Sequence, residues 1–399
     1  MSRIRIGGIA LLVLMVACTP VAAVGGESVA HERPSIDTVD DCSFPVTMTD
    51  DSGTEVTLED EPETVVTLNP SAAQTMWEIG AEEKVVGTTK HAENLEGASE
   101  RTNISTDAET IEPEIVVDLE PDLVLAPSSN FVSEETVETL REAGVTVYYF
   151  QSAESLEEVR ERTLLVGSLV GECEGAEETV AWMDDELEIV EAALEGEERP
   201  DVLYTFFGFT AGEETFIHEL IETGGGTNVA AEAGVAAYEQ LSEETVVEQD
   251  PDWIVLNTNS PEMPDSSAYE STTAVQSDQV VTVDINHLNR PGPRVIHAIT
   301  TFAETFHPEA YAAATADAAD EPTGDGDSAD DDGGDSSADD EPDVDDDAPA
   351  ETTESDDETA GDDADGVPGF GLASAATAAA VVAVALAAIG SLRHRNDRS

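Results

Sequence analysis

The chain has 399 residues, a formal net charge of -74 at pH 7 and 40% hydrophobic residues. The sequence contains two lysines, Lys84 and Lys90, so carboxylates dominate nearly every surface that the chain can present. Such a charge excludes nucleic acid as an ordinary partner, because its phosphates would be repelled. Repulsion among carboxylates opposes folding unless salt screens it, over a Debye length of roughly 3 Å near molar ionic strength. We therefore interpret the chain as a protein of a halophile.

A secretory signal peptide is predicted over residues 1–24. Arg3 and Arg5 precede an apolar run from Ile6 to Ala17, and small residues follow that run. This order is typical of a signal for export. Cys18 follows a short motif that loosely resembles a lipoprotein box, so lipid attachment at Cys18 remains an alternative to its removal with the signal.

Two cysteines remain beyond the signal, Cys42 and Cys173. An exported chain meets an oxidising environment in which a disulfide persists. We predict that the two are joined, which would tie the N-terminal segment to a later helix. Two separate buried thiols are the alternative, but thiols outside the cell tend to oxidise.

The opening of the folded body is predicted to be a hairpin over Val46–Leu58, broken at Asp51-Ser-Gly53. After it, short β-rich runs alternate with helical segments as far as Tyr311, the pattern of α/β units with largely parallel sheets. The expected strands form two groups: Thr64–Leu68, Val85–Gly87, Leu123–Ala126 and Val145–Phe150, then Val202–Phe207, Trp253–Leu256 and Val280–Val283.

A long helical stretch separates the two groups of strands. From Ser155 to Leu194 the apolar residues recur at helical spacing in two runs, so one or two long helices connect the groups. Gly171-Glu-Cys-Glu-Gly175 is where a break would fall. We place an N-terminal lobe at 44–153, a helical linker at 154–197 and a C-terminal lobe at 198–311.

An internal repeat indicates that the two lobes are related. Glu114-Ile-Val-Val-Asp-Leu-Glu-Pro-Asp-Leu-Val-Leu recurs as Glu244-Thr-Val-Val-Glu-Gln-Asp-Pro-Asp-Trp-Ile-Val. Each copy predicts a short helix, a Pro-Asp turn that ends it, and a buried strand. Chance similarity between two helix-turn-strand units is the alternative.

The C-terminal part is predicted to be a stalk followed by a membrane signal. Residues 317–365 are almost wholly acidic, small or proline, so we expect a disordered acidic stalk over 312–366. An uncharged run from Leu372 to Leu392 is long enough to span a bilayer, and basic residues follow it. Residues 367–399 therefore predict a transmembrane helix that tethers the body outside the cell.

This C-terminal order resembles the tripartite sorting signal of archaeal surface proteins. The resemblance rests on Pro368, Gly369 and Phe370, which stand before the apolar run and the basic end. It implies that an archaeosortase processes the chain there and exchanges the helix for a lipid. A permanent transmembrane helix is the alternative.

The body from about Phe44 to Tyr311, roughly two thirds of the chain, resembles the solute receptors of ABC importers for cobalamin, siderophores and haem. The motifs that carry this resemblance are Thr64-Val-Val-Thr-Leu-Asn-Pro-Ser-Ala-Ala-Gln-Thr-Met-Trp-Glu-Ile-Gly, Val85-Val-Gly, Glu120-Pro-Asp-Leu-Val-Leu-Ala, Gly224-Gly-Gly-Thr-Asn and Arg290-Pro-Gly-Pro-Arg294. Each is weak alone, but their order and spacing are specific. The resemblance implies a class III periplasmic-binding-protein fold, with two Rossmann-like lobes joined by a long helical backbone.

The resemblance also implies the function and the partners. The chain would be an extracellular, monomeric solute-binding protein that captures cobalamin or a related corrinoid and delivers it to a permease with its ATPase. A ferric siderophore or haem is the alternative ligand, and no resident cofactor is implied. Glu114 and Glu244 match the family's glutamates, one at the tip of each lobe, that pair with permease arginines, and such carboxylates would steer docking onto a basic partner.

The ligand should lie between the lobes, among loops that leave the carboxyl ends of the strands. The candidates by this rule are Asn69, Pro70, His91, Pro127 and Ser128 in the first lobe, and Phe207, Phe209, Tyr238, Asn286, His287 and Arg290 in the second. The two phenylalanines offer flat apolar surface to a corrin or chelate, and the polar members could bond its amides or carboxylates.

The first lobe departs from the cobalamin receptors. Where they place aromatic residues, this chain has His91 and Pro127, so we favour a corrinoid only slightly over a ferric siderophore. We interpret Trp77, Trp182 and Trp253 as core residues, because they fall within expected helices or a strand.

Three further classes of function are weaker. His91 and His287 could bind a bare metal across the cleft, but His218, His297 and His307 fall on expected helices away from it. No Gly-x-Ser-x-Gly elbow, phosphate loop or His-Glu-x-x-His motif indicates an enzyme, so no catalytic residue is predicted. A structural surface protein is the last alternative, which the glycosylation sequon Asn103-Ile-Ser105 would allow.

Overall fold

The computed structural model describes residues 42–106, 110–129 and 132–320. The predictions for the signal peptide at 1–24, Cys18, the stalk beyond residue 320 and the sorting signal at 367–399 lie outside the described residues. Within the part of the chain that the structure describes, no helix is both long and apolar enough to cross a membrane.

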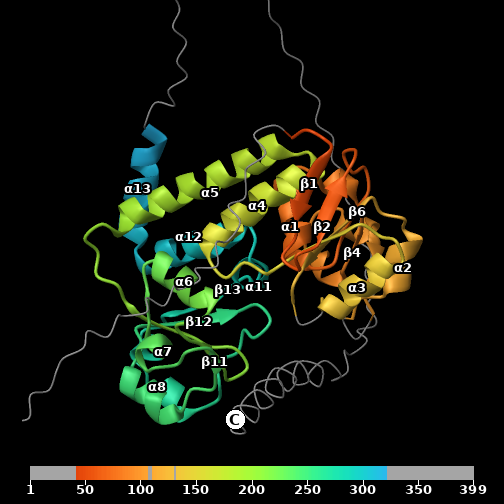
Figure 1. Cartoon of the computed structure of the whole chain (residues 1–399). Coiled ribbons are helices and arrows are strands. Elements are labelled where there is room, and N and C mark those ends of the chain that lie inside the picture. Colours follow the sequence, from red (N-terminus) through yellow and green to blue (C-terminus); the bar gives the residue numbers. More distant parts are fainter. Residues whose placement is uncertain (1–41, 107–109, 130–131, 321–399) are drawn as a thin grey trace, which may run out of the picture. The chain divides into compact units, whose positions relative to one another are not determined.

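The first lobe consists of the predicted hairpin and one parallel sheet (Figure 1). The hairpin pairs β1 (Val46–Thr49) with β2 (Glu55–Leu58). The sheet has the order β5-β4-β3-β6-β7, with bounds β3 (Val65–Thr67), β4 (Val85–Thr88), β5 (Thr102–Asn103), β6 (Leu123–Pro127) and β7 (Val147–Phe150). Its helices are α1 (Pro70–Glu78), α2 (Pro113–Asp118) and α3 (Glu134–Glu142), with short 3-10 turns η1 (Glu82–Lys84), η2 (Lys90–Ala92) and η3 (Ala98–Glu100).

The second lobe repeats this plan with a smaller parallel sheet in the order β10-β8-β12-β13. Its strands are β8 (Asp201–Tyr204), β10 (Thr227–Asn228), β12 (Trp253–Asn257) and β13 (Val280–Val283), and β9 (Thr210–Ala211) pairs separately with β11 (Tyr238–Glu239). Its helices are α6 (Phe216–Thr223), α7 (Val229–Glu232), α8 (Glu243–Gln249), α9 (Ser267–Glu270), α10 (Thr273–Gln276), α11 (Ile285–Leu288), α12 (Val295–Phe306) and α13 (Pro308–Asp320). The prediction of two α/β lobes is confirmed.

Two helices form the predicted linker, α4 (Leu156–Val170) and α5 (Cys173–Leu194). Gly171 ends α4 in the left-handed conformation at φ 81°, which glycine adopts without a Cβ clash. The break therefore falls where the sequence predicts it. The two helices pack against each other and connect the lobes (Figure 1).

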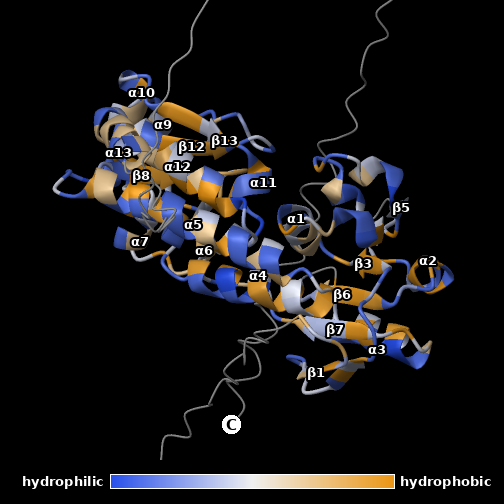
Figure 2. Ribbon diagram, turned by 90° about the horizontal axis from the view of Figure 1, so that it is seen from above, coloured by the Kyte–Doolittle hydropathy of each residue, from blue (hydrophilic) through white to orange (hydrophobic). Residues whose placement is uncertain are grey.

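Each lobe packs its core on a different end of the linker. The first lobe covers Leu165, Leu169 and Ala176, around the junction of the two helices. The second lobe covers Leu156 at the start of α4 and Val190 near the end of α5. In Figure 2 the hydrophobic colour concentrates on strands such as β6 and β12, whereas α5 shows both colours. Burial of these apolar faces is the main force that holds the lobes to the linker.

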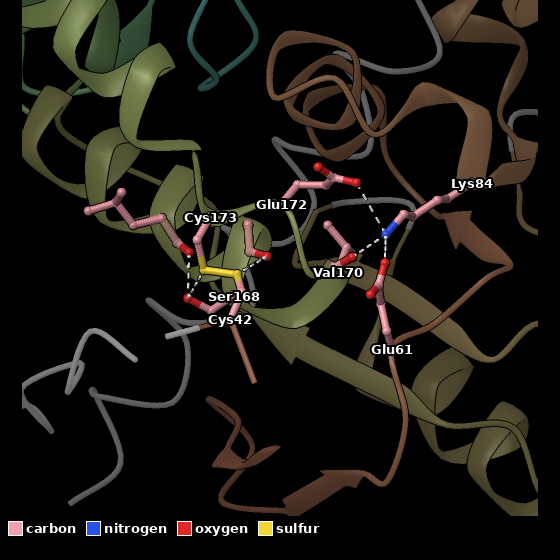
Figure 3. The surroundings of a disulfide bond; sticks show 9 residues. Cys42, Glu61, Lys84, Ser168, Val170, Glu172 and Cys173 are labelled. Atoms are coloured by element: carbon pink, nitrogen blue, oxygen red, sulfur yellow. Dashed lines mark hydrogen bonds and ion pairs between the residues drawn. A yellow bond between two sulfur atoms is a disulfide. The ribbon is translucent and has the colours of Figure 1, made fainter. Parts of the chain in front are cut away.

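The disulfide between Cys42 and Cys173 is confirmed, with a Cα–Cα distance of 5.9 Å. Figure 3 shows the disulfide and, beside it, a junction of ion pairs around Lys84. The Lys84 Nζ donates to Glu61 Oε1 at 2.6 Å and lies 3.3 Å from Glu172 Oε1. One of the two lysines of the chain therefore joins the first lobe to the start of α5.

The internal repeat is a structural repeat. Each copy consists of a short helix, α2 or α8, followed by a left-handed residue, a Pro-Asp pair and a central strand, β6 or β12. The left-handed residues are Glu120 at φ 47° and Asp250 at φ 40°. Asp122 then accepts the backbone N–H of Thr64 at 2.9 Å, and Asp252 accepts that of Asp201 at 3.0 Å. In both lobes the repeat ties the central strand to the start of its neighbour.

Two predicted boundaries are corrected. The strand predicted over Val202–Phe207 ends at Tyr204, because a tight turn reverses the chain between Phe206 and Phe209, whose backbones bond each other at 2.8 and 2.9 Å. Residues 312–320, which the prediction assigned to the disordered stalk, belong instead to α13, which continues to Asp320 against α5. The alanine-rich stretch there has high helix propensity, which outweighs its acidic composition.

The tryptophans lie where the sequence predicts them. Trp77 lies in α1, Trp182 in α5 and Trp253 in β12, and each is partly buried against a hydrophobic core. The Trp77 Nε1 donates to the Glu96 carbonyl at 2.8 Å. All three are framework residues.

Candidate functional site

A cavity of about 1040 Å3 lies between the lobes. In the first lobe, Ser128 follows β6 and Ser152 follows β7; in the second, the start of α6 and β11 complete the wall. The described lining residues are Ser128, Ser129, Val132, Ser133, Tyr149, Ser152, Ala153, Glu154, Glu213, Glu214, Thr215, Phe216, His218, Glu219 and Tyr238. This placement agrees with the rule that open parallel sheets bind ligands outside the carboxyl ends of their strands.

A narrow gap of about 10 Å3 continues the floor of this cavity and shares Ser152 and Ala153 with it. Pro127 at the end of β6 lines the gap, opposite Pro291 of the second lobe. Arg162 of α4 also lines the gap. The floor is therefore a tight contact of both lobes with the linker, with no room for a ligand.

Aromatic side chains gather on the second lobe beside the cavity. The ring centroid of Phe206 lies 6.1 Å from that of Phe209 and 5.8 Å from that of Tyr238, the latter edge-on. Phe207 occupies the tip of the tight turn at φ 47°, where its side chain is 52% exposed, and Tyr238 is 47% exposed. Large aromatic side chains exposed next to a cavity are typical of a binding surface.

Four carboxylates line the cavity: Glu154, Glu213, Glu214 and Glu219. None of the described lining residues is Lys or Arg. Burial raises the pKa of Glu219, while the Leu156 backbone N–H, which donates to its carboxylate at 3.2 Å, acts in the opposite direction. The cavity is thus electrostatically unsuited to an anionic ligand.

His218 belongs to the cavity wall, which corrects the prediction that it lies away from the cleft. Thr215 caps α6 by accepting the His218 backbone N–H, and this cap brings the first turn of the helix to the cleft. The Asn228 amide nitrogen lies 3.4 Å from His218 Nδ1. In the tautomer in which Nδ1 accepts this hydrogen bond, the ring hydrogen lies on Nε2. In that tautomer His218 can donate a hydrogen bond to a carbonyl oxygen.

The sequence predicts neither His218 nor the glutamates as lining residues. β9 and α6 are too short to stand out by periodicity, and the Thr215 N-cap was the one available signal for this helix start. β9 belongs to an antiparallel pair, so the carboxyl-end rule for parallel sheets does not select residues 213–219 either.

Outside the lining of this cavity, polar contacts of the Arg290, Arg294 and Gln74 side chains join the two lobes. Arg290 donates to the His91 carbonyl at 2.6 Å and to Asn94 Oδ1 at 2.7 Å. Arg294 pairs with Glu78 at 2.5 Å. The Gln74 side chain donates to the Asn286 carbonyl at 3.3 Å. We call this set the interlobe joint.

The guanidinium predicted to meet the ligand is therefore engaged by the first lobe. Burial lowers the pKa of Arg290 to about 10, which still leaves the group protonated at neutral pH. Of the predicted ligand residues, His91, Asn286 and Arg290 take part in the interlobe joint, whereas Ser128 and Tyr238 line the cavity.

His287 packs against His297 of α12, with ring centroids 4.9 Å apart. Burial lowers the pKa of His287, and the neighbouring His297 lowers it further. His307 lies at the end of α12 with Nε2 3.0 Å from the Gly225 carbonyl. Across the described residues, no group of three or more His, Cys, Asp or Glu side chains is placed to hold a metal ion.

The remaining first-lobe candidates shape the backbone at the cleft. Asn69 caps α1, because its Oδ1 accepts the Ser71 N–H at 2.6 Å, and Pro70 opens the helix. The Ser128 hydroxyl donates to Gln151 at 2.9 Å and accepts the Ser152 N–H at 3.1 Å, which holds the ends of β6 and β7 together.

Glu114 and Glu244 occupy equivalent places in the two lobes. Each lies in the first turn of its repeat helix, α2 or α8, and each side chain is exposed. In an α/β unit the helix that precedes a parallel strand starts at the carboxyl edge of the sheet, the edge that faces the cleft. Both glutamates therefore stand on the cleft side of their lobes.

The comparisons with known proteins agree with this architecture. A family model described as periplasmic binding protein matches residues 65–286. A cobalamin-binding protein of Halobacterium salinarum is 38% identical over 310 residues, which cover 74% of this chain and 84% of that protein. An uncharacterized ABC transporter substrate-binding lipoprotein of Bacillus subtilis, YvrC, is 27% identical over 284 residues, which cover 67% of this chain and 87% of that protein.

Among solved structures, the periplasmic heme-binding protein RhuT of Roseiflexus superposes with a TM-score of 0.56 at 25% identity. The match covers 62% of this chain and 99% of RhuT. The chain belongs to the periplasmic binding protein family, and its two lobes with a helical linker are the class III form of that fold.

Proposed function

We propose that this protein is the extracellular solute-binding component of an ABC importer and that its solute is cobalamin or a related corrinoid. The observation that carries the proposal is the interlobe cavity of about 1040 Å3 in a periplasmic-binding-protein scaffold, between the carboxyl ends of β6 and β7 in the first lobe and the start of α6 and β11 in the second. Its volume lies at the upper end of the range for small-molecule pockets. The relative at 38% identity is a cobalamin-binding protein, which supports the same ligand.

The chemistry of the cavity favours a corrinoid over the alternative chelates. A corrin ring carries neutral amide side chains, whereas haem carries two propionates and many siderophores are anionic. A wall with four carboxylates and no cation among its described residues disfavours anionic ligands. Tyr238 and Phe207 offer apolar faces to the macrocycle, and His218, with Ser128, offers hydrogen-bond donors to its amides.

Of the other predicted ligand residues, Phe209 supports the aromatic wall, and Pro127 supports the floor. Asn69 and Pro70 hold the start of α1 at the cleft. His91, Asn286, His287 and Arg290 would act at the edge of the site, where the interlobe joint sets the separation of the lobes.

Delivery would use the two glutamates at the lobe tips. Glu114 and Glu244 would pair with basic groups of a permease, which works with an ATPase. Exposed carboxylates in repeated helices suit a symmetric partner. The protein would remain outside the cell, tethered by its C-terminus after an archaeosortase has acted at Pro368-Gly369-Phe370, and mass spectrometry of the mature C-terminus would test this.

Calorimetry tests the ligand. The exported full chain, in concentrated salt, is titrated with cyanocobalamin, a ferric hydroxamate and haem. We expect one-to-one binding of cobalamin only, without turnover. Tyr238→Ala should weaken cobalamin binding about tenfold, a loss of ~1.4 kcal/mol in binding free energy. Val280→Ala lies at the amino end of β13, outside the cavity lining, and should leave the affinity unchanged. Binding of the hydroxamate or of haem alone would identify that compound as the ligand in place of a corrinoid. Absence of binding by all three would refute the proposal.

Uptake assays test the docking surface. The double variant Glu114→Ala, Glu244→Ala should abolish cobalamin uptake into cells while calorimetry shows unchanged binding. Exchange of the neighbouring glutamates Glu112, which is half-buried, and Glu243, which is exposed, for Ala provides the control. Loss of binding in the first variant, or loss of uptake in the control, would contradict the assignment.

A further inference from the structure

The motif Asn103-Ile104-Ser105 has no part in solute binding. It matches the acceptor pattern for N-linked glycosylation, Asn-x-Ser/Thr with x not proline, and it is the one match in the sequence. Asn69-Pro70-Ser71 has a similar spacing but fails the pattern because of its proline. The chain therefore contains one acceptor motif and one natural negative control.

The local geometry places the acceptor amide and the hydroxyl of the motif together. Asn103 ends β5 and is exposed, whereas Ser105 is buried. The Ser105 hydroxyl donates to Asn103 Oδ1 at 2.8 Å, and the Ser105 backbone N–H donates to the same oxygen at 3.0 Å. The Asn103 amide nitrogen, Nδ2, donates in turn to the Ser105 carbonyl at 3.1 Å.

This arrangement has a chemical consequence for Asn103. An amide nitrogen is a poor nucleophile because its lone pair is delocalised into the carbonyl group. Hydrogen bonds to the carbonyl oxygen stabilise the imidate form, in which negative charge lies on oxygen and Nδ2 has lost one proton. Ser or Thr at position 105 can supply such a hydrogen bond, whereas Ala cannot.

The place of Asn103 in the fold also suits a large modification. β5 lies at one edge of the first-lobe sheet, and among the described residues it pairs with β4 alone. An exposed sheet edge is a template for pairing with another chain, and proteins protect such edges with charge, with bulges or with covering groups. Lysine, a common protecting residue, is almost absent from this sequence. A bulky, hydrophilic group at the end of β5 would cover the edge.

We propose that Asn103 is a glycosylation site of the exported protein. The donor is a glycan linked through a phosphate or diphosphate to a polyisoprenyl lipid. Asn103 Nδ2 forms the bond to the sugar C1, the bond from C1 to the phosphate oxygen breaks, and that oxygen keeps the electron pair. The proton lost by the amide is taken up by the departing phosphate, so no oxidant or reductant is needed.

The glycan would stand beside the docking surface of the first lobe. The Glu112 backbone N–H donates to the Ile104 carbonyl at 2.9 Å, which places the motif next to the start of α2 and near Glu114. The glycan would therefore border the permease contact of one lobe only.

Mass spectrometry of the full chain, expressed in a haloarchaeal host and purified from its membrane, tests the proposal. Trypsin releases the peptide from Thr102 to Arg141, because no Lys or Arg lies between them. We expect this peptide to be heavier by at least one sugar unit, with the modification on Asn103, and the peptide that holds Asn69 to be unmodified.

Variants separate the modification from the structural role of the motif. Ser105→Thr should keep the glycan, whereas Ser105→Ala and Asn103→Gln should lose it, and cobalamin binding by each variant reports that the first lobe is folded. An unmodified wild-type peptide would overturn the proposal, as would a glycan that persists in Asn103→Gln. Because the glycan is detected by mass spectrometry, failure of the corrinoid proposal would leave this test intact, and circular dichroism would then report whether each variant is folded.

Discussion

The two copies of the internal repeat have the same backbone but different partners. In the first lobe, Asp122 accepts the N–H groups of Glu63 and Thr64 and the Thr64 hydroxyl, at 2.9 to 3.0 Å. In the second lobe, Asp252 accepts the N–H of Asp201 at 3.0 Å, and burial together with this neighbouring carboxylate raises the pKa of Asp201. The repeat therefore preserves the strand junction, while the residue opposite the aspartate decides how strongly the junction is held.

The same contrast extends to the whole lobes. The first lobe is joined to the linker by the disulfide and by the Lys84 junction, and it contains Asp50, whose buried carboxylate pairs with Arg141. The second lobe is held to the linker by the apolar packing of α12 on α5, and its ion pair between Arg199 and Glu222 is exposed. Both lobes bury apolar side chains against the linker, and the first lobe adds a covalent cross-link and an ion pair to this packing.

The largest effect should come from removing the disulfide. Cys42→Ser with Cys173→Ser opens a loop of 131 residues, and the chain-entropy model predicts a loss of about 5 kcal/mol in the free energy of unfolding. Urea unfolding at constant high salt measures the loss. Hydrogen exchange should show that amides of the first lobe lose more protection than those of the second, and equal loss in both lobes would contradict the comparison.

A smaller loss should follow from Asp50→Asn. The Asp50 side chain is fully buried and accepts from the Ser52 hydroxyl at 2.6 Å, from the Tyr149 N–H at 3.1 Å and from Arg141. Removal of its charge leaves Arg141 without its counter-ion, which costs about 3 kcal/mol. The pair of Asp51 and Arg162 is the control, because the Asp51 side chain is 32% exposed whereas that of Asp50 is fully buried, and Asp51→Asn should cost under about 1 kcal/mol.

The same carboxylate should make stability depend on pH. Burial opposes ionisation of Asp50, but the hydrogen bonds from Ser52, Tyr149, Thr54 and Arg141 outweigh it and lower its pKa. A lowered pKa contributes stability that is fully present above the unfolded value of about 4 and is lost as the pH falls through the folded value. Acid unfolding should therefore be steeper in the wild type than in Asp50→Asn, and parallel curves would contradict this.

Gly292→Ala should disturb the interlobe joint. A Cβ at this position would lie 2.6 Å from Gln74 Oε1, and the Gln74 side chain is fully buried and cannot move away easily. We expect a loss of about 1 kcal/mol from overpacking. Gln74→Ala should remove the clash, so unfolding of the double variant should show a smaller loss than the sum of the single losses. Additive losses would mean that the two side chains do not meet.

The smallest effect concerns the repeat itself. Asp122→Ala removes three hydrogen bonds and should cost about 1 kcal/mol, whereas Asp252→Ala removes one and relieves repulsion with Asp201, so it should cost under about 0.5 kcal/mol. Chemical unfolding of the two variants side by side measures the difference. Equal losses would show that the junctions are held by strand pairing and not by the aspartates.

Local patterns in the sequence were sufficient for the framework. The alternation of strands and helices, the break at Gly171 and the pairing of Cys42 with Cys173 were predicted and are confirmed. They could be predicted because each depends on a local signal: periodicity, a glycine with a left-handed backbone, or an even number of cysteines in an exported chain. The end of β8 was misplaced because the turn at Phe206–Phe209 has no Pro and only Gly208 as a local marker.

The site was predicted only in outline. The carboxyl-end rule selected Ser128 and Tyr238, which line the cavity, but it missed His218 and Glu219 of the short helix α6. It also could not show that Arg290 is held by His91 and Asn94 of the other lobe.

The sequence by itself determined an acidic, exported, two-lobed α/β protein with a helical linker, one disulfide and a duplicated strand junction, because these follow from composition, periodicity and repetition. Tertiary structure alone decided which side chains face the cavity and which join the lobes. Partners such as Arg294 and Glu78 meet only when both lobes pack on opposite ends of the linker. That geometry depends on the shapes of buried side chains across the whole body, for which no local pattern exists.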